Sequence, residues 1–349
     1  MERTTQKEAN QINSHMIIKR SLSTDRLLFI FASKDATEIK VCGFMERVKK
    51  MIRYSGAVRA GVSGKGVSIA VLDSGIMPHP DLVERIAGFR DFTRLRKSSA
   101  YDDCGHGTHI NGILAGNGSL SEGRLQGMAP QCRLLNGKIL DHKGEGDADS
   151  MLKALQWVLQ LHKEQNIRIL NLSVAVYQME DVQKLKELSD MLDHLCEKGI
   201  LVVTAAGNRG PKTGSISGIA ASSKVLTVGC HDYGYRDAKG KSCEMHSGRG
   251  TPGEVRKPDL VAPGTDISSC GFEYRRGKNI VWGYMAKTGT SMAVPIVSGA
   301  AALLTEKYPD MGVYMLKRKL QESTTDLYEA QIKQGYGMLN LEKMFYPVN

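Results

Sequence analysis

A chain of 349 residues, with 41% hydrophobic and 24% charged side chains, is long enough for one large α/β domain with an appendage or for two ordinary domains. It contains no low-complexity tract, no repeat and no apolar run long enough to cross a membrane, so fibrous, solenoid and membrane-spanning proteins are excluded. More than half of the net charge of +10 lies in residues 1–60, and no basic stripe with interleaved aromatic residues follows, so we expect no nucleic-acid partner.

The cysteines and the start of the chain predict a cellular compartment. The seven cysteines are odd in number and scattered, without a Cys-x-x-Cys pair; they are Cys42, Cys104, Cys132, Cys196, Cys230, Cys243 and Cys270. This pattern is typical of reduced thiols rather than of a disulfide framework or a zinc site. The first apolar run, 27–32, is too short and lies too far along the chain for an export signal. We therefore expect a cytoplasmic protein without membrane contact.

The first fifty residues precede a regular alternation of strands and helices. They hold one strand-like stretch, 26–33, and one helix-like stretch, 39–51. Their basic charge fits a solvated tail.

From about residue 62 onward, short apolar runs alternate with helical patterns. The runs are rich in Val, Ile and Leu, as is typical of strands buried on both faces; they are 67–72, 134–140, 167–174, 200–206 and 225–228. Apolar residues recur at three-to-four spacing within 152–159 and 182–195, which predicts helices. This alternation predicts an α/β fold with a mostly parallel sheet and helices on both faces.

Two polar residues follow predicted strands closely. Asp73 comes directly after 67–72, and Asn208 comes two residues after 200–206. In parallel sheets, functional sites form at the carboxyl ends of the strands. The sequence therefore predicts a site that contains both side chains.

A histidine and a serine lie in two further glycine-containing segments. His106 stands in GHGTH (105–109), and Ser291 stands in GTSMAVP (289–295), which opens an apolar helix. Taken singly, Asp73 fits a turn or cap residue, His106 a structural histidine and Ser291 a helix N-cap. The order Asp, His, Asn, Ser along one chain makes these separate explanations much weaker.

The four segments resemble the motifs of the subtilisin-like serine proteases. The similarity extends over about residues 51–345, through PDL (80–82), GMAP (127–130), NLS (171–173), KPDLVAPG (257–264) and GYGMLN (335–340). The stretch 115–130 most resembles bacterial minor intracellular enzymes of this type. The resemblance implies a three-layer α/β sandwich and a serine endopeptidase domain at 51–349. It also implies that 1–50 is a truncated prodomain or inhibitory extension, with a basic tail as the alternative.

The resemblance gives each of the four residues a role in amide hydrolysis. A serine hydroxyl is a weak nucleophile unless a base removes its proton, so Ser291 is the nucleophile and His106 the base. Asp73 accepts the hydrogen bond of the other imidazole nitrogen. The backbone N–H of Ser291 and the side-chain amide of Asn208 are the oxyanion donors. This chemistry requires no cofactor.

An extended polypeptide substrate is expected to pair with strand edges of the enzyme. By resemblance, the binding residues are Ser173, Val174 and Ala175 on one edge, Gly144, Glu145 and Gly146 on the opposing edge, and Ala206 and Gly207. Ala175 stands where the family usually has glycine, so we expect a narrower groove near the P1 side chain. The carboxylates of Glu145, Asp147 and Asp149 predict a modest preference for Lys or Arg at P2 or P4. A solvated loop at a helix start is the alternative for these three residues.

A structural calcium ion is the one cofactor that the resemblance raises. The loop that supplies most calcium ligands in secreted members is not recognisable within 116–127. Asp81 alone matches a ligand position, and a turn role explains it equally simply.

One rival class remains beside the endopeptidase: a non-catalytic peptide-binding protein or regulator on the same fold. Such proteins usually lack a catalytic residue, whereas all four positions are intact here. The sequence does not separate general protein turnover from processing of a single partner, and it does not predict the oligomeric state.

Overall fold

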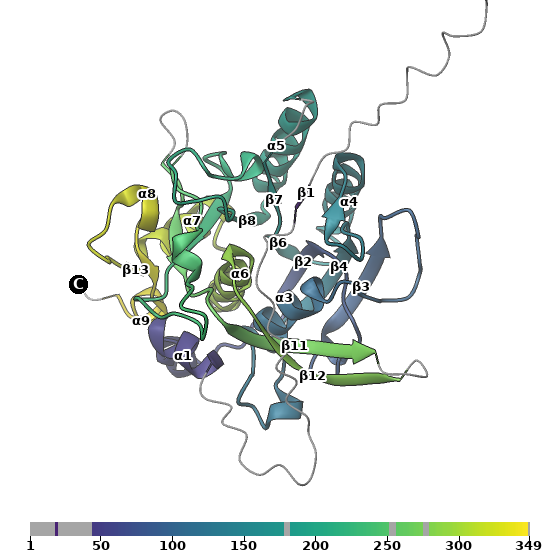
Figure 1. The fold of residues 1–349 in the computed structure, drawn as a ribbon, viewed down its shortest axis with the longest axis horizontal. Helices are drawn as coiled ribbons and strands as arrows, with labels where there is room; N and C mark the ends of the chain where they lie inside the picture. Colours follow the sequence, from purple (N-terminus) through teal and green to yellow (C-terminus); the bar gives the residue numbers. More distant parts are fainter. Residues whose placement is uncertain (1–17, 20–43, 178–181, 251–255, 275–278, 348–349) are drawn as a thin grey trace, which may run out of the picture.

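A computed structural model describes residues 18–19, 44–177, 182–250, 256–274 and 279–347 (Figure 1). A nine-stranded sheet lies at its centre, with the strand order β13-β14-β10-β9-β8-β6-β2-β4-β3. All neighbouring strands are parallel except β13 and β14. The strands are β2 (Ser68–Asp73), β3 (Ile86–Asp91), β4 (Arg133–Lys138), β6 (Ile167–Leu172), β8 (Leu201–Ala205), β9 (Leu226–Cys230), β10 (Leu260–Ala262), β13 (Thr324–Thr325) and β14 (Met338–Leu339).

Strand β2 occupies the middle of the sheet, and all six of its residues are buried. It pairs with β4 on one side and β6 on the other, so Ala70 lies between Leu135 and Leu170. A strand covered on both faces needs apolar residues at successive positions, which explains the continuous apolar runs in the sequence. All five predicted strands are confirmed. The edge strand β3 was not predicted because only one of its residues is buried.

Helices cover both faces of the sheet (Figure 1). Residues of α3 and α6 belong to the larger apolar core, and residues of α4 and α5 belong to the second core on the other face. The predicted three-layer α/β sandwich is therefore confirmed. The helices are α1 (Phe44–Met51), α2 (Ser55–Ala60), α3 (His106–Ala115), α4 (Ala148–Leu161), α5 (Val182–Glu197), α6 (Thr290–Lys307), α7 (Val313–Glu322), α8 (Gln331–Gln334) and α9 (Leu341–Phe345).

Helix α1 crosses the boundary that the sequence suggested at residue 50. Its Met45 and Val48 side chains, together with Ile52, are buried in the larger core. The body of the domain therefore includes residues from 44 onward. The predicted strand at 26–33 and the first part of the predicted helix, 39–43, lie outside the described residues.

In the described segments, five more strands lie outside the central sheet. The hairpin of β11 (Ile267–Tyr274) and β12 (Ile280–Lys287) contacts α3. A small antiparallel sheet joins β1 (Ile18–Lys19), β5 (Glu145–Gly146) and β7 (Ala175–Val176), with β1 in the middle.

The structure corrects the expectation that all cysteines are reduced thiols. Cys230, at the end of β9, and Cys243, at the start of a short 3₁₀ helix, form a disulfide with a Cα–Cα distance of 5.9 Å. This distance is normal for a disulfide. The fold brings the two residues together across the loop 231–242, and their spacing in the sequence carries no signal for this contact.

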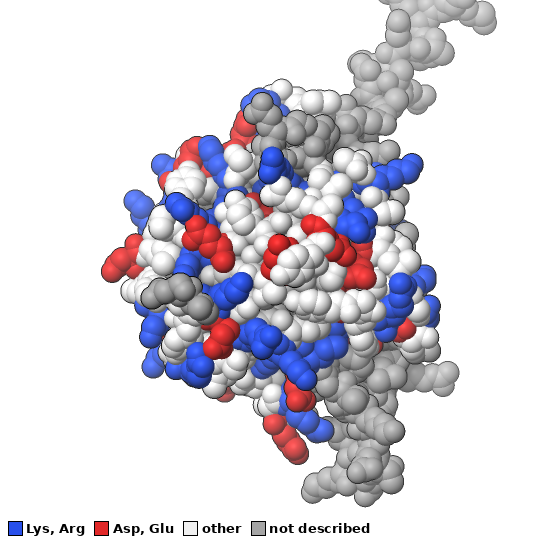
Figure 2. Space-filling model, turned by 90° about the vertical axis from the view of Figure 1, so that its left-hand side faces the viewer, with Lys and Arg blue, Asp and Glu red and all other residues white. Residues whose placement is uncertain are grey.

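The surface is charged with both signs. On the face that carries α7, α8 and α9, Lys and Arg side chains are interspersed with Asp and Glu (Figure 2). Ion pairs here include Arg318–Glu322 within α7 at 2.7 Å, and Lys333 of α8 with Glu329 of the preceding loop at 3.5 Å. Among the residues that the structure describes, no helix is both long enough and apolar enough to span a bilayer.

Candidate active site

The Asp73 carboxylate and the His106 imidazole are in direct contact. Asp73 is the last residue of β2 and His106 the first residue of α3. His106 Nδ1 lies 2.7 Å from Asp73 Oδ1, and the Ser74 N–H donates to the same oxygen at 2.7 Å. Both residues are buried. Since a carboxylate only accepts hydrogen bonds, Nδ1 carries the proton, and the lone pair of a neutral imidazole is then on Nε2.

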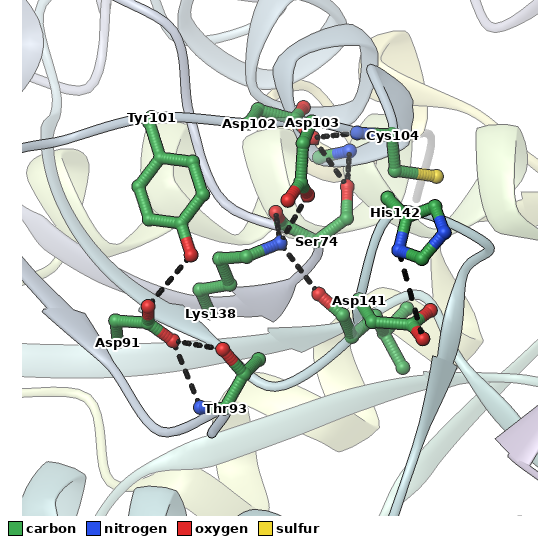
Figure 3. A network of polar contacts seen from close by, with 12 residues as sticks. Ser74, Asp91, Thr93, Tyr101, Asp102, Asp103, Cys104, Lys138, Asp141 and His142 are labelled. Carbon is green, nitrogen blue, oxygen red and sulfur yellow. Dashed lines mark hydrogen bonds and ion pairs between the residues drawn. The ribbon is translucent and has the colours of Figure 1, made fainter. Parts of the chain in front are cut away.

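A second carboxylate, Asp102, fixes the start of the histidine helix (Figure 3). Asp102 is fully buried, and its two oxygens accept hydrogen bonds from five groups at 2.7–3.0 Å. The donors are the hydroxyls of Ser74 and Thr108 and the backbone N–H groups of Cys104, Gly105 and Thr108. Ser74 Oγ in turn accepts from the Gly107 N–H at 2.8 Å. Ser74 is thus hydrogen-bonded to Asp102, which binds the backbone before His106, and to the Gly107 N–H after it.

A fully buried ammonium group supports the same turn from β4 (Figure 3). Lys138 Nζ donates at 2.7 Å to three oxygens, namely Ser74 O, Leu140 O and Asp103 Oδ1. Ser74 follows Asp73, and Leu140 precedes the loop that leads to β5. Lys138 therefore holds the strand end that carries Asp73 against the segment that leads to a predicted substrate edge.

Ser291 lies in the first turn of α6 and is 6% exposed. Helix α6 packs against α3, which begins with His106. In the described part of the chain, no hydrogen bond joins the Ser291 hydroxyl to His106; such bonds commonly tighten only when substrate is bound. The N–H of Ser291 belongs to the first helical turn, where backbone donors have no intrahelical acceptor.

The amide of Asn208 has a defined orientation. Its Oδ1 accepts from the backbone N–H and from the hydroxyl of Thr290, each at 3.0 Å. Its Nδ2 is buried and has no hydrogen-bond partner among the described residues. A buried donor without an acceptor is rare in folded proteins. Because Thr290 directly precedes Ser291, this donor group lies beside the start of α6.

Comparison with known proteins places this chain in a family. The subtilase family model (Peptidase_S8) matches residues 64–338. The chain belongs to the subtilase family. It is 34% identical to Serine protease AprX of Bacillus subtilis (strain 168) over 288 residues, which are 79% of this chain and 65% of that protein. It is 34% identical over 282 residues to the Major intracellular serine protease of the same organism, covering 78% of each chain. It is 31% identical over 292 residues to Subtilisin Savinase of Lederbergia lenta, covering 83% of this chain and 95% of that protein.

Some relatives of this subtilase are considerably longer than it is. The chain spans 65% of the length of AprX and 48% of the length of the Minor extracellular protease Epr, to which it is 30% identical.

The two predicted substrate edges of the subtilase lie on either side of one strand. β1 pairs antiparallel with β5 and with β7, so Lys19 is opposite both Glu145 and Ala175. Ser173 and Val174, which lead into β7, are buried. The edges are therefore far enough apart to hold one extended strand between them.

The acidic residues near β5 differ from the predicted cluster. Asp147 is the N-cap of α4, where its Oδ1 accepts from the Ser150 N–H at 2.8 Å. Asp149 forms an ion pair with Lys184 at 2.9 Å, and only Glu145 lies in the edge strand itself. Two of the three carboxylates thus have internal partners, as the alternative of a loop at a helix start implies.

The surroundings of Asp81 do not fit calcium. Asp81 Oδ1 accepts from Ser119 Oγ at 2.9 Å and from the Leu120 N–H at 3.0 Å, and Oδ2 accepts from Tyr284 Oη at 2.7 Å. Calcium needs six to eight oxygen ligands, whereas protein donors already use this carboxylate.

A softer metal at the same place is also a poor fit. Asp81, His79 and Cys270 form a buried cluster, but His79 uses both ring nitrogens in hydrogen bonds, to Gly283 O and from the Asp81 N–H. Burial, together with the Asp81 carboxylate, raises the pKa of the Cys270 thiol well above its usual range. The thiolate that a metal would bind is therefore disfavoured.

Sequence reasoning missed four residues that support the site: Ser74, Asp102, Lys138 and Thr290. Ser74 and Thr290 adjoin Asp73 and Ser291, and Asp102 stands four residues before His106, so proximity to the motifs was a usable signal. Lys138 stands at the carboxyl end of β4, next to the end of β2. The rule that found Asp73 passed over Lys138, because the predicted strand ran on to residue 140 and the true strand ends at Lys138.

Proposed function

We propose that this subtilase is a serine endopeptidase that hydrolyses peptide bonds of extended polypeptides through an acyl-enzyme. The proposal assigns Ser291 as nucleophile, His106 as base and acid, Asp73 as its partner and Asn208 as oxyanion donor. The observation that carries it is the buried, unpartnered Asn208 Nδ2 beside the start of α6, together with the 2.7 Å contact of Asp73 with His106. The similarity to serine proteases along 78–83% of the chain supports it.

In the first half of the reaction, Ser291 Oγ attacks the carbonyl carbon while His106 Nε2 takes its proton. The carbonyl oxygen becomes an oxyanion, which accepts hydrogen bonds from the Ser291 N–H and from Asn208 Nδ2. His106 then donates its proton to the amide nitrogen, the C–N bond breaks and an amine leaves. Asp73 holds the imidazole in the Nδ1–H tautomer and stabilises the imidazolium that forms. Thr290 orients the Asn208 amide before the reaction, so its NH₂ group is already in position for the negative charge that develops on the carbonyl oxygen.

In the second half, water replaces the amine. His106 Nε2 takes a proton from the water as its oxygen attacks the acyl carbon, and the same two donors bind the second oxyanion. Collapse breaks the bond to Ser291 Oγ, which recovers its proton from His106, and a carboxylic acid leaves.

The test of this function is product analysis with a denatured protein substrate. Wild-type protein should generate internal cleavage products, and Ser291→Ala should lower kcat by about 10⁶-fold, the size known for subtilisin. The exposed Ser99 offers a matched control, because Ser99→Ala makes the same chemical change away from the site. Binding of the substrate by wild type without any cleavage would favour the rival class, a non-catalytic peptide-binding protein.

We further propose that the N-terminal extension inhibits the enzyme by occupying its substrate cleft. Support comes from β1, whose backbone pairs with both edges that a substrate strand is expected to use. An extended peptide and β1 would compete for the same hydrogen bonds. The extension is tethered to the domain, so an external substrate meets a high local concentration of competitor.

Proline substitutions in β1 test this inhibition. Ile18→Pro/Lys19→Pro removes both backbone donors of the strand and should raise the initial rate of peptide hydrolysis several-fold. The matched control Ile18→Val/Lys19→Arg keeps both donors and should leave the rate unchanged. Intact mass must show that each chain is uncut during the assay. Equal rates for the proline and control variants would refute the inhibitory role.

For the location, we propose that the enzyme acts inside a bacterial cell. Support comes from its 34% identity to the Major intracellular serine protease of Bacillus subtilis. The Cys230–Cys243 disulfide argues in the opposite direction, because cytosolic thiols are normally kept reduced. Immunodetection in fractionated cells should find the protein with cytoplasmic markers, and recovery from the medium would overturn the proposal.

A further inference from the structure

Tyr177 connects the segment after β7 with the segment that carries Asn208. It follows β7 by one residue, and its hydroxyl accepts the backbone N–H of Asn208. A Cβ atom placed on Gly207 would clash with Tyr177 Oη, so the ring end is in direct contact with this backbone. Gly207 also has φ +94°, a conformation that other residues rarely adopt. The tyrosine and the strand end that carries Asn208 thus fit each other closely.

A cation holds the ring from another direction. The Arg209 guanidinium lies over the Tyr177 ring, with its carbon 4.2 Å from the ring centroid. This is the geometry of a cation–π contact. The ring is therefore held by a hydrogen bond at its tip and a cation on its face, although the side chain is only partly buried. Displacing it would break both contacts.

In the proposed binding mode, one substrate side chain comes close to this ring. A bound peptide that follows β7 and presents its scissile carbonyl to Asn208 Nδ2 has its P1 residue between the edge 173–175 and the segment 206–208. The P1 side chain then enters the space between these two segments, where the Tyr177 ring lies. In this space, Tyr177 and a large P1 side chain exclude each other.

We propose that Tyr177 determines P1 specificity by filling part of the P1 pocket, so that the enzyme prefers small P1 residues such as Ala, Ser or Gly. This inference rests on the proposed peptidase function and on its assignment of Ser291 and Asn208. The ring restricts the volume of the pocket, and Arg209 keeps the ring in place. The Tyr177 hydroxyl has a separate effect, because it holds the backbone of the oxyanion donor.

Two substitutions separate the ring from the hydroxyl. Tyr177→Ala removes the ring and should open the pocket, whereas Tyr177→Phe keeps the ring and removes only the acceptor of the Asn208 N–H. Tyr177→Leu fills an intermediate volume and serves if the alanine variant folds poorly. Tyr314 on α7 is 57% exposed, so Tyr314→Ala is the matched control for loss of a tyrosine ring.

The experiment compares kcat/KM for two peptides that differ only in having Ala or Phe at P1. Wild type and Tyr314→Ala should favour Ala by about tenfold or more, since pocket volume commonly discriminates by about 10–200-fold. Tyr177→Ala should lower this ratio at least tenfold, Tyr177→Leu should give an intermediate ratio, and Tyr177→Phe should keep the ratio while lowering kcat for both peptides. A wild-type preference for Phe, or a ratio that Tyr177→Ala leaves unchanged, would overturn the proposal.

A binding measurement separates this inference from the proposed function. In the Ser291→Ala background, Kd for the same peptides should show the same order of preference and the same shift with Tyr177→Ala. If wild type hydrolyses neither peptide, the proposed function fails, and the Kd ratios still decide the role of Tyr177. Ratios of Kd that are equal with and without the ring would refute that role.

Discussion

Lys138→Met removes the buried ammonium group that joins the Asp73 turn to the entrance of β5. Methionine has a similar length and no charge, so it fills the space of the lysine side chain without a donor. Ser74 O and Leu140 O then lose the Lys138 donor, and Asp103 loses its cation. We expect the variant to fold with a lower free energy of unfolding. We also expect the backbone at Asp73 and Ser74 to be less firmly fixed.

The size of this effect follows from the three contacts. Breaking a buried ion pair by removing one partner costs about 3–5 kcal/mol. Asp103 is 30% exposed and regains water, so its share is small, whereas the unpartnered carbonyl groups cost about 1–3 kcal/mol each. We therefore expect the free energy of unfolding to fall by about 3 kcal/mol. The kcat of the folded variant should fall at least tenfold, because the strand end that carries Asp73 is held less firmly.

The assay is urea unfolding in the Ser291→Ala background, which prevents self-digestion, with peptide kinetics on the active enzyme. Lys143 is exposed and close by, so Lys143→Met is the matched control and should change the unfolding free energy by less than about 0.5 kcal/mol. A loss below about 1 kcal/mol for Lys138→Met would refute the energetic argument. Unchanged kcat in a destabilised variant would show that Lys138 has a structural role only.

Three further substitutions test other parts of the site. Asp102→Asn replaces one carboxylate oxygen by an NH₂ group, which would face the N–H and O–H donors that now bind Asp102. We therefore expect the unfolding free energy to fall by about 3 kcal/mol and kcat to fall as well. Calorimetry and peptide kinetics measure the two effects, and wild-type values for both would refute the role of these hydrogen bonds. Asn208→Ala should lower kcat by on the order of 10²–10³, the size known for the equivalent donor in subtilisin, whereas a loss confined to KM would mean that Asn208 binds substrate. Burial lowers the pKa of His109 well below its usual value. In the unfolded chain, His109 therefore takes up a proton as the pH falls through about 6.5, whereas in the folded chain it stays neutral. The contribution of His109 to the free energy of unfolding is therefore fully present above that pH. Below it, stability falls by up to about 1.4 kcal/mol per pH unit, and His109→Gln should flatten this slope in urea unfolding measured from pH 7 to 5.5.

The central sheet could be predicted from the sequence because its strands are buried on both faces. β2 has only buried residues, so its apolar run is continuous and unambiguous. β13 and β14 have two residues each and show no period, and β3 has a mostly half-exposed pattern. Such strands form because neighbouring strands supply their hydrogen-bond partners. The pattern of residues in the strand itself does not reveal these partners.

The residues that we propose to react were chosen from their motifs, whereas the contacts that support them could not be predicted. The direction of the Asn208 amide depends on Thr290, 82 positions away, and the disulfide depends on how β9 ends beside Cys243. The place of Tyr177 against Gly207 likewise arises from packing between distant segments. These contacts form only in the folded chain, so no pattern in the sequence reports them.

The most direct test of the central claim is the covalent labelling of Ser291. Purified wild-type protein and Ser291→Ala would be treated with a fluorophosphonate, then measured by intact mass and by peptide mapping. The account predicts one added label on wild type, mapped to Ser291, and no label on Ser291→Ala. Labelling of a different serine would contradict it. So would the absence of any label on both wild type and the Ile18→Pro/Lys19→Pro variant, whose substrate cleft is open.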